Sequence, residues 1–338
     1  MIDTPLPLLL REVVFMSSKV AISKQTIVKA APVLVLIGLC IGISLIDSQF
    51  LSLSNLIRVA SAASAPLVLA LGVTFIILMG SIDLSIEGSM AFTAAVLCAF
   101  VANSTSNGIP LGLFAVPVAL VAAALFGCIV GAIHVYMNVP SFMVSLGMGF
   151  VGTGLATVLL GGERVTILDQ NVRALALGRW FDVPIAVYIA LVMLAVAWFI
   201  QDHMRIGRHI MALGGGEDLA RASGVNTRRV RLMAFTIAGA FFGVGAVLAC
   251  ARLGAGSALI GSGQLFTAVS SVVVGGTALT GGKGGVFNTL VGVLIVMVLN
   301  NGMIIIGLPT FVQQGVLGLV IIVAVLLNSP IRSFAVVK

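Results

Sequence analysis

Apolar stretches of about 17–25 residues recur along almost the whole chain, and each is close to the roughly 20 residues that a helix needs to cross a bilayer. Of the 338 residues, 60% are hydrophobic and 9% are charged, whereas soluble domains average about 25% charged residues. The sequence therefore predicts an all-α fold, a polytopic membrane helix bundle of about ten transmembrane helices with broken or re-entrant segments. The same pattern argues against an ordinary soluble enzyme, a disordered chain and a β-barrel.

Ten segments are candidate spans, of which the third and the eighth are short. They cover residues 30–46, 59–79, 88–102, 111–137, 139–160, 184–200, 232–251, 265–279, 286–306 and 308–328. Glycine, proline and serine interrupt several of them, as in Ser64-Ala65-Pro66, which indicates close packing or a local break that lines a cavity. Ten crossings, and eight crossings with two re-entrant segments, both leave the two ends of the chain on one side, so both topologies stay open.

Basic residues give the predicted orientation. With an even number of crossings, most of the 18 Lys and Arg residues fall on the side of the two termini, which the positive-inside tendency makes cytoplasmic. We expect a cytoplasmic N-terminal segment at 1–29, a transmembrane domain at 30–328 with a cytoplasmic loop at 201–231, and a cytoplasmic tail at 329–338. The opposite loop, 161–183, is either a solvated connection or a surface that receives a partner or solute.

The net charge, the chain length and the positions of the cysteines argue against several functions. The net charge of +7 follows from this topology, so we expect membrane lipid but no nucleic acid among the partners. The chain leaves no room for a separate soluble domain of about 100 residues, so any catalytic domain that drives it would have to be on another chain. The four cysteines lie in apolar stretches without metal or redox spacing and are expected to be small buried hydrophobes: Cys40, Cys98, Cys128 and Cys250.

Two glycine motifs partly match the signatures of nucleotide-binding sites. Residues 147–152 read GxGxxG, but they lie inside an apolar span, where the strand and helix of a dinucleotide site have no place. Gly281-Gly282-Lys283 is followed by Gly284, where a phosphate loop requires Ser or Thr. The three histidines, His134, His203 and His209, lack metal-ligand spacing. We therefore expect no catalytic residue, no metal and no cofactor on this chain.

Two Gly-rich turns, 80–89 and 275–285, resemble each other weakly, and each joins an inward-running span to an outward-running one. Their common orientation suggests a parallel repeat. The candidate gate or turn residues are Asp83, Ser85, Glu87, Gly88, Gly281, Gly282 and Lys283. Asp83 and Glu87 are expected where water reaches them. They either cap and orient the following helix or order a broken helix at an inner gate.

Polar uncharged residues inside spans are the candidates for a solute path, with Phe75 or Phe266 supplying apolar faces. They are Ser64, Thr74, Asn103, Ser145, Thr153, Gln264, Asn288, Asn300 and Asn301. We select Ser64, Phe75, Ser145, Asn300 and Asn301 as the candidate translocation path. Each can equally hold helices together, and the pairs Gly38/Gly42, Gly127/Gly131 and Gly239/Gly243 predict close helix packing.

The long loop 201–231 contains one helix-competent stretch. After the glycines at 214–216, residues Glu217 to Ser223 have acidic residues in the first turn, and Gly224 is placed to end the helix. A second, basic helix then re-enters the membrane. A short helix between glycine hinges suits contact with a cytoplasmic partner, and the alternative is a basic loop at the lipid surface.

Three separated motifs carry a family resemblance. Residues 207–225, Gly-Arg-His-Ile-Met-Ala-Leu-Gly-Gly-Gly-Glu-Asp-Leu-Ala-Arg-Ala-Ser-Gly-Val, resemble the cytoplasmic signature of the ribose-type ABC importer permeases, which share a family with branched-chain amino acid permeases. Residues 83–89 resemble that family's first Gly-rich turn, although Ile86-Glu87 replaces a single Val and adds a residue. The segments 274–277, 281–284, 289–292 and 299–302 complete the match over about residues 50–328.

The resemblance implies a permease subunit of an inner-membrane importer for a monosaccharide or related sugar, working by alternating access. Its expected partners are a second permease chain in a homo- or heterodimer, a cytoplasmic ATP-binding subunit that holds ATP and Mg²⁺, and a periplasmic sugar-binding protein. The residues that would dock into the ATPase are Glu217, Asp218, Leu219, Ala220, Arg221, Ala222, Ser223 and Gly224. The alternatives are an ion-gradient-driven secondary transporter of a small polar solute and a non-transporting membrane scaffold.

Overall fold

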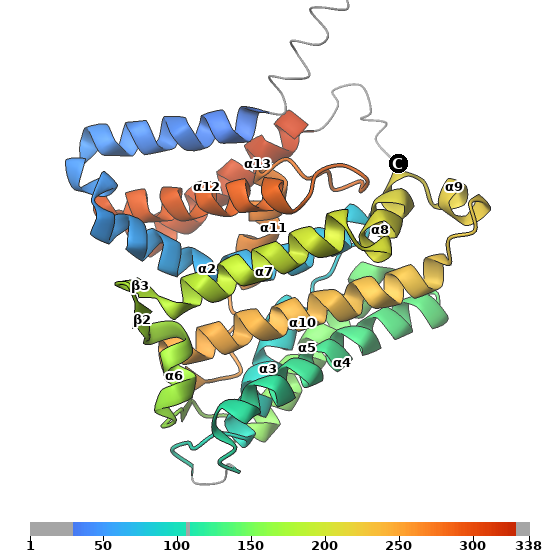
Figure 1. Cartoon of the computed structure of the whole chain (residues 1–338), viewed down its shortest axis with the longest axis horizontal. Helices are drawn as coiled ribbons and strands as arrows, with labels where there is room; N and C mark the ends of the chain where they lie inside the picture. The colour runs from blue at the N-terminus through green and yellow to red at the C-terminus, as the bar shows by residue number, and fades with distance from the viewer. Residues whose placement is uncertain (1–29, 106–108, 329–338) are drawn as a thin grey trace, which may run out of the picture.

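The computed structural model describes residues 30–105 and 109–328, and most of its regular structure is helical (Figure 1). Six helices are long and apolar enough to cross a bilayer: α2 (Leu53–Leu78), α4 (Ala115–Tyr136, preceded by the 3-10 helix η2, Gly112–Phe114), α5 (Ser141–Leu159), α7 (Ile185–Asp202), α10 (Thr227–Leu253) and α12 (Val286–Ile305). The predicted all-α polytopic bundle is confirmed. The predicted terminal segments 1–29 and 329–338 lie outside the described residues.

Four further apolar helices complete the ten predicted segments. They are the helix Ala30–Ile46, α3 (Ile86–Ala99), α11 (Gln264–Val274) and α13 (Thr310–Asn328). The third and eighth segments are indeed short, because α3 has 14 residues and α11 has 11. All ten segments are therefore helical, and the number of helices that cross the bilayer stays a prediction.

The short polar elements gather at the two ends of the bundle (Figure 1). One end carries α8 (Arg205–Gly215) and α9 (Glu217–Ala222), and the other carries α6 (Gln170–Leu177) with two small ribbons. In the ribbons, β1 (Val165–Thr166) pairs antiparallel with β4 (Ala255–Gly256), and β2 (Arg179–Trp180) with β3 (Val183–Pro184). Another 3-10 helix, η1 (Ser48–Leu51), precedes α2.

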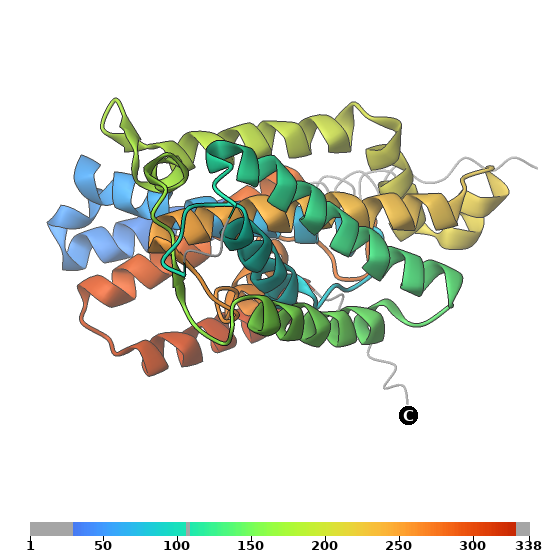
Figure 2. The same ribbon diagram turned by 90° about the horizontal axis from the view of Figure 1, so that it is seen from below.

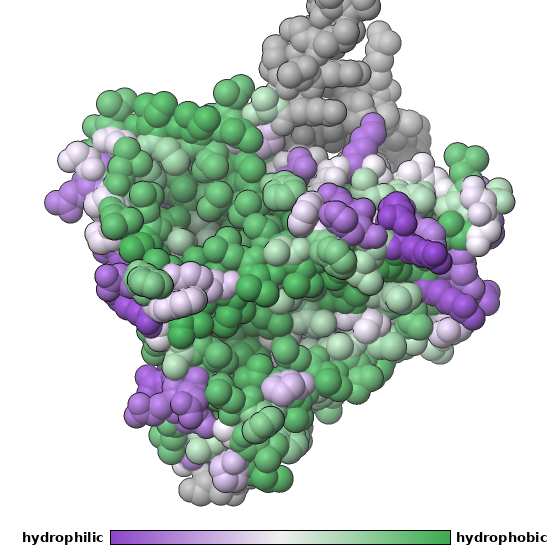
Figure 3. All heavy atoms as spheres, viewed as in Figure 1, coloured by the Kyte–Doolittle hydropathy of each residue, from purple (hydrophilic) through white to green (hydrophobic). Residues whose placement is uncertain are grey.

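Hydrophilic residues cover these two ends, and hydrophobic residues cover the surface between them (Figure 3). The arrangement is that of a multi-pass membrane protein, because the band of exposed apolar side chains would contact lipid. The predicted loop 161–183 is more than a solvated connection, since it contains β1, α6 and β2 and buries Val172 and Ala176 of α6.

The core is built around α2 and α10, the two most buried of the spanning helices. Helix α2 contacts α7, α10, α11 and α12, and α10 also packs along α4. Seen from below, α10 runs through the middle of the bundle between α7 and the pair α4 and α5 (Figure 2). The exposed faces of α4, α5 and α7 form the outer surface.

Glycines permit a close crossing of α4 and α10. A Cβ atom on Gly239 of α10 would lie 3.0 Å from the Cα atom of Gly127 of α4, and one on Gly243 would lie 2.6 Å from the Cβ atom of Ala123. The predicted close packing is confirmed for Gly127/Gly131 and Gly239/Gly243. It is wrong within this chain for Gly38/Gly42, because a Cβ atom at either position would meet no described atom within 4 Å.

The two Gly-rich turns differ in the helices that flank them. The first turn follows the long helix α2 and precedes the short helix α3, whereas the second follows the short helix α11 and precedes the long helix α12. This opposite order gives the suggested parallel repeat no support from the flanking helices.

Candidate functional site

The two Gly-rich turns meet at the end of the bundle that carries α8 and α9. The N–H of Gly282 donates a hydrogen bond of 2.9 Å to the carbonyl oxygen of Leu78, the last residue of α2. A Cβ atom on Gly214 of α8 would lie 1.9 Å from the same carbonyl oxygen. Gly281 and Gly282 have φ angles of +85° and +72°, which favour glycine. The turns therefore form one junction with the end of α8, while Lys283 stays exposed.

Asp83 is buried next to this junction. Its side chain is only 3% exposed and accepts the backbone N–H of Ser85 at 2.8 Å. The expectation that water reaches Asp83 is therefore wrong, because the turn folds against the start of α5. There the Ser145 hydroxyl accepts the N–H of Leu84 at 2.9 Å, so Ser145 anchors the turn.

Glu87 connects the first turns of the two short helices. Its carboxylate accepts the N–H of Gly263, the residue before α11, at 2.9 Å, while Glu87 itself lies in the first turn of α3. Next to it, a Cβ atom on Gly88 would lie 2.0 Å from the carbonyl oxygen of Gly149 in α5. Gly149 and Gly152 of the GxGxxG motif thus pack against the start of α3 and the residues before it, whereas a Cβ atom on Gly147 would meet no described atom within 4 Å. The variant turn has one residue more than the family's pattern, at Ile86-Glu87. Through the Glu87 carboxylate it links the start of α3 to the start of α11.

A cavity of about 800 Å³ adjoins the start of α11. Helices α2, α11, α12 and α13 and the connection before α11 line it, through Arg58, Gln264, Phe266, Ser270, Asn300, Asn301 and Gln313 among others. Gln264 Oε1 is buried without a hydrogen-bond partner in the described part of the chain. Phe266 is 71% exposed and offers its ring. We call this space the α11–α12 cavity.

The five candidate path residues divide between this cavity and the packed interior. Asn301 lines the cavity but exchanges hydrogen bonds with Asn55 of α2, at 3.0 and 3.3 Å. Its neighbour Asn300 also lines the cavity, and its amide makes no hydrogen bond within residues 30–105 and 109–328. Ser64 donates to Ala60 of its own helix at 2.9 Å, and Phe75 is fully buried against Phe241 with ring centroids 5.9 Å apart.

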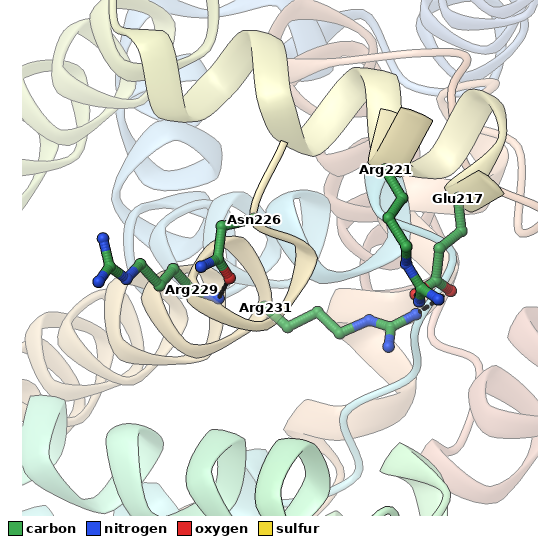
Figure 4. Close-up of polar contacts among 5 residues, drawn as sticks. All are labelled: Glu217, Arg221, Asn226, Arg229 and Arg231. Carbon is green, nitrogen blue, oxygen red and sulfur yellow. Dashed lines mark hydrogen bonds and ion pairs between the residues drawn. The ribbon is translucent and has the colours of Figure 1, made fainter. Parts of the chain in front are cut away.

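Helix α9 is the predicted short helix of the long loop. It runs from Glu217 to Ala222, has both acidic residues in its first turn, and ends before Gly224, whose φ is +82°. The Glu217 carboxylate forms ion pairs with Arg221 at 2.9 Å and with Arg231 of α10 at 2.5 Å. Figure 4 shows Glu217 reached by Arg221 and Arg231, while Arg229 points away. The ion pairs tie α9 to the start of α10.

The exposed surface of α9 is partly apolar. Leu219 is 75% exposed although it lies at a hydrophilic end of the molecule, whereas Ala220 is buried. Asp218, Arg221, Ala222, Ser223 and Gly224 are exposed as well. The helix therefore has one side that anchors it and another that is free to contact a partner.

Sequence reasoning missed helix α8. The segment 205–215 was interpreted as part of a loop with glycine hinges, but Gly214 and Gly215 belong to the helix and only Gly216 separates it from α9. The buried residues Ile206, Ile210 and Leu213 recur at helical spacing, which is the signal that predicts this amphipathic helix. Gln201 was missed too: its side-chain oxygen accepts the N–H of Val286 at 2.8 Å and holds the start of α12.

The chain matches the family model described as branched-chain amino acid transport system / permease component over residues 55–325. It is 31% identical to the ribose import permease protein RbsC of Escherichia coli (strain K12) over 311 residues, which cover 91% of this chain and 95% of that protein. From the same strain, the probable ABC transporter permease protein YphD is 36% identical over 82% of both chains. The D-allose transport system permease protein AlsC is 30% identical over 84% of this chain and 86% of its own. No solved structure matches the chain.

The matched range contains α2 from residue 55 onward, the other five long apolar helices, both Gly-rich turns, the α11–α12 cavity and α9. Within the described residues, no group of three or more His, Cys, Asp or Glu side chains could hold a metal ion. The chain belongs to the family of branched-chain amino acid transport system permease components, as a ribose-type ABC permease subunit and not an enzyme.

Proposed function

We propose that this chain is the membrane subunit of an ATP-driven importer that moves a monosaccharide across the inner membrane by alternating access. The sugars in the names of its relatives support this class of solute, and the choice among pentoses, hexoses and related sugars stays open. A second permease chain, a cytoplasmic ATP-binding subunit and a periplasmic sugar-binding protein would complete the transporter. ATP and Mg²⁺ would belong to the ATP-binding subunit.

The exposed apolar residue on α9 carries the proposal for coupling. Leu219 is 75% exposed at a polar end of the bundle, so its side chain is free to insert into an apolar pocket of a partner protein as an anchor. Glu217 joins α9 to α10 through Arg231, so a push on α9 would reach a membrane helix directly. We infer that residues 217–224 dock into the ATP-binding subunit and that the α8–α9 end faces the cytoplasm.

The α11–α12 cavity supports the proposal for the solute path. The unpartnered amide of Asn300 and the buried Oε1 atom of Gln264 suit hydrogen bonds to sugar hydroxyls, and the exposed Phe266 ring suits the apolar face of a sugar. A second permease chain would close the open side of this cavity. The candidate gate residues would then hold in place the helices that flank the two Gly-rich turns. These residues are Asp83, Ser85, Glu87, Gly88, Gly281, Gly282 and Lys283.

Leu219→Asp tests the coupling in proteoliposomes that contain the chain with its ATP-binding subunit and binding protein. We expect at least a tenfold loss of subunit co-purification and of solute-stimulated ATP hydrolysis, because the anchor side chain becomes charged. Met204→Asp is the control, since Met204 is also exposed but precedes α8, outside residues 217–224. Normal assembly and hydrolysis by Leu219→Asp would refute the coupling role.

Sugar uptake in the same vesicles distinguishes a defect in the solute path from a defect in assembly or ATP hydrolysis. Asn300→Leu removes a cavity-lining amide that bonds no other described residue, so assembly and basal ATP hydrolysis should persist while sugar uptake falls about tenfold. Normal uptake by this variant would remove the α11–α12 cavity from the path.

A further inference from the structure

A second cavity, of about 670 Å³, lies at the end of the bundle that carries α9. Its walls are the connection between α4 and α5, helix α9 and the first turns of α10. Three apolar spanning helices end or begin here, at Tyr136, Ser141 and Thr227. The ends of such helices lie at the depth of the lipid headgroups. We call this space the α4–α9–α10 cavity.

The lining of the cavity is cationic. The lining contains three guanidinium groups, those of Arg221, Arg228 and Arg231, and one carboxylate, that of Glu217. Glu217 is already shared between Arg221 and Arg231, and Arg228 has no ion pair in the described part of the protein. Figure 3 shows hydrophilic residues gathered at this end of α10, next to the hydrophobic band. The cavity therefore favours an anionic group.

Two lining residues contribute buried polar atoms without partners, Nε of Arg231 and Nε2 of His134. Nδ1 of His134 lies 2.6 Å from the carbonyl oxygen of Val139, so Nδ1 carries a hydrogen and donates it to that oxygen. Arg231 Nε–H is a donor. An anionic oxygen can accept from Arg231 Nε–H, and a hydroxyl, which both donates and accepts, can pair with His134 Nε2.

We call the end of α4 and the start of α5, which flank the lining residues of the α4–α5 connection, the rim of the cavity, and both carry exposed apolar side chains. Tyr136 and Met137 at the end of α4 are 64% and 68% exposed, and Phe142 and Met143 at the start of α5 are exposed as well. Most of the α5 surface faces outward, so the exposed band continues from this rim along the helix. A ligand with an anionic head and apolar chains matches the cavity and the rim together, whereas an acidic protein segment would leave the rim without an apolar partner.

We propose that the α4–α9–α10 cavity binds the headgroup of an anionic phospholipid, a phosphodiester that also carries free hydroxyls, as phosphatidylglycerol does. The phosphate accepts hydrogen bonds from Arg231 and Arg228, and a headgroup hydroxyl pairs with Nε2 of His134. The acyl chains pack on the exposed faces of α4 and α5. The bound lipid joins the start of α10 to the α4–α5 connection, which the ion pairs of Glu217 do not reach.

Thermal unfolding of the full chain in neutral detergent, titrated with dioctanoyl-phosphatidylglycerol, tests this proposal. The melting temperature should rise with phosphatidylglycerol but not with dioctanoyl-phosphatidylcholine. Arg228→Gln should weaken the apparent affinity about fivefold, because one basic side chain near the phosphate is lost. Arg229→Gln is the matched control: it removes the same charge from the next residue, which does not line the cavity, and it should change the affinity less than twofold.

Three further measurements test the site, the identity of the ligand and the role of His134. Equal effects of Arg228→Gln and Arg229→Gln would overturn the site, since they would indicate only general attraction to an anionic surface. Binding of glycerol 3-phosphate as strong as that of the lipid would overturn the lipid as ligand and favour a soluble phosphate ester. Dioctanoyl-phosphatidylmethanol has no free hydroxyl and should bind more weakly than phosphatidylglycerol, and equal binding would overturn the role of His134.

Discussion

Single glycines set the helix spacing at several crossings of this bundle. At Gly88, Gly214 and Gly275 a Cβ atom would approach a backbone carbonyl oxygen to 2.0, 1.9 and 2.0 Å. Such distances are far below van der Waals contact, so each position requires glycine or a shift of the backbone. Elsewhere the same residue type has no such role, because a Cβ atom on Gly147 would meet nothing within 4 Å.

Gly88→Ala should therefore destabilise the protein by about 2–3 kcal/mol, because its methyl group overlaps the backbone of Gly149 and pushes α3 from α5. The melting temperature in detergent measures the effect. Gly147→Ala is the control within α5, and it should be neutral or stabilise by up to about 1 kcal/mol, since alanine favours helix and the site is open. Equal melting temperatures of the two variants would contradict the packing described for Gly88.

Helices α8 and α9 and the first turns of α10 form a charged unit at one end of the bundle. Helix α8 buries one apolar side, α9 follows after a single glycine, and the Glu217 ion pair with Arg231 fixes α9 to α10. Partly exposed ion pairs stabilise a fold weakly, by about 1 kcal/mol or less. The ion pairs therefore matter for where α9 is held, and little for the stability of the whole bundle.

Glu217→Gln should loosen α9, because both ion pairs depend on this carboxylate. We expect amide hydrogen exchange in residues 217–225 to accelerate about fivefold, with little change in α10. Asp218→Asn removes an equal charge from the same first turn, but Asp218 forms no ion pair with any described residue, so exchange should change less than twofold. Similar acceleration in the two variants would indicate that the helix dipole, and not the bridge to α10, holds α9.

The molecule as a whole has two polar ends and an apolar middle (Figures 1 and 3). Helix α9 and the turn before β1 lie at opposite ends. Because basic residues are most frequent in the long loop that contains α9, we expect that end to be cytoplasmic. The orientation decides which side supplies ATP and which side supplies solute.

Labelling with a membrane-impermeant maleimide tests the orientation. Asp218→Cys should react only in inverted membrane vesicles, and Glu163→Cys, in the turn before β1, only in right-side-out vesicles. The unmodified chain is the control, because Cys98 and Cys250 are buried and Cys40 and Cys128 are half-buried in apolar helices. The reverse pattern would invert the proposed topology, and labelling of both variants from one side would contradict a bundle with two separated polar ends.

Hydropathy and motif order were enough to predict the membrane class, all ten helical segments, helix α9 and the family, because each depends on residues close together in the chain. The burial of Asp83 and the division between Asn300 and Asn301 were not predictable in this way. Adjacent residues of a helix point about 100° apart, so what each of them meets depends on which distant helix packs there. Asn301 meets Asn55, Asn300 meets a cavity, and Gly88 meets Gly149, because the tertiary packing brought those segments together.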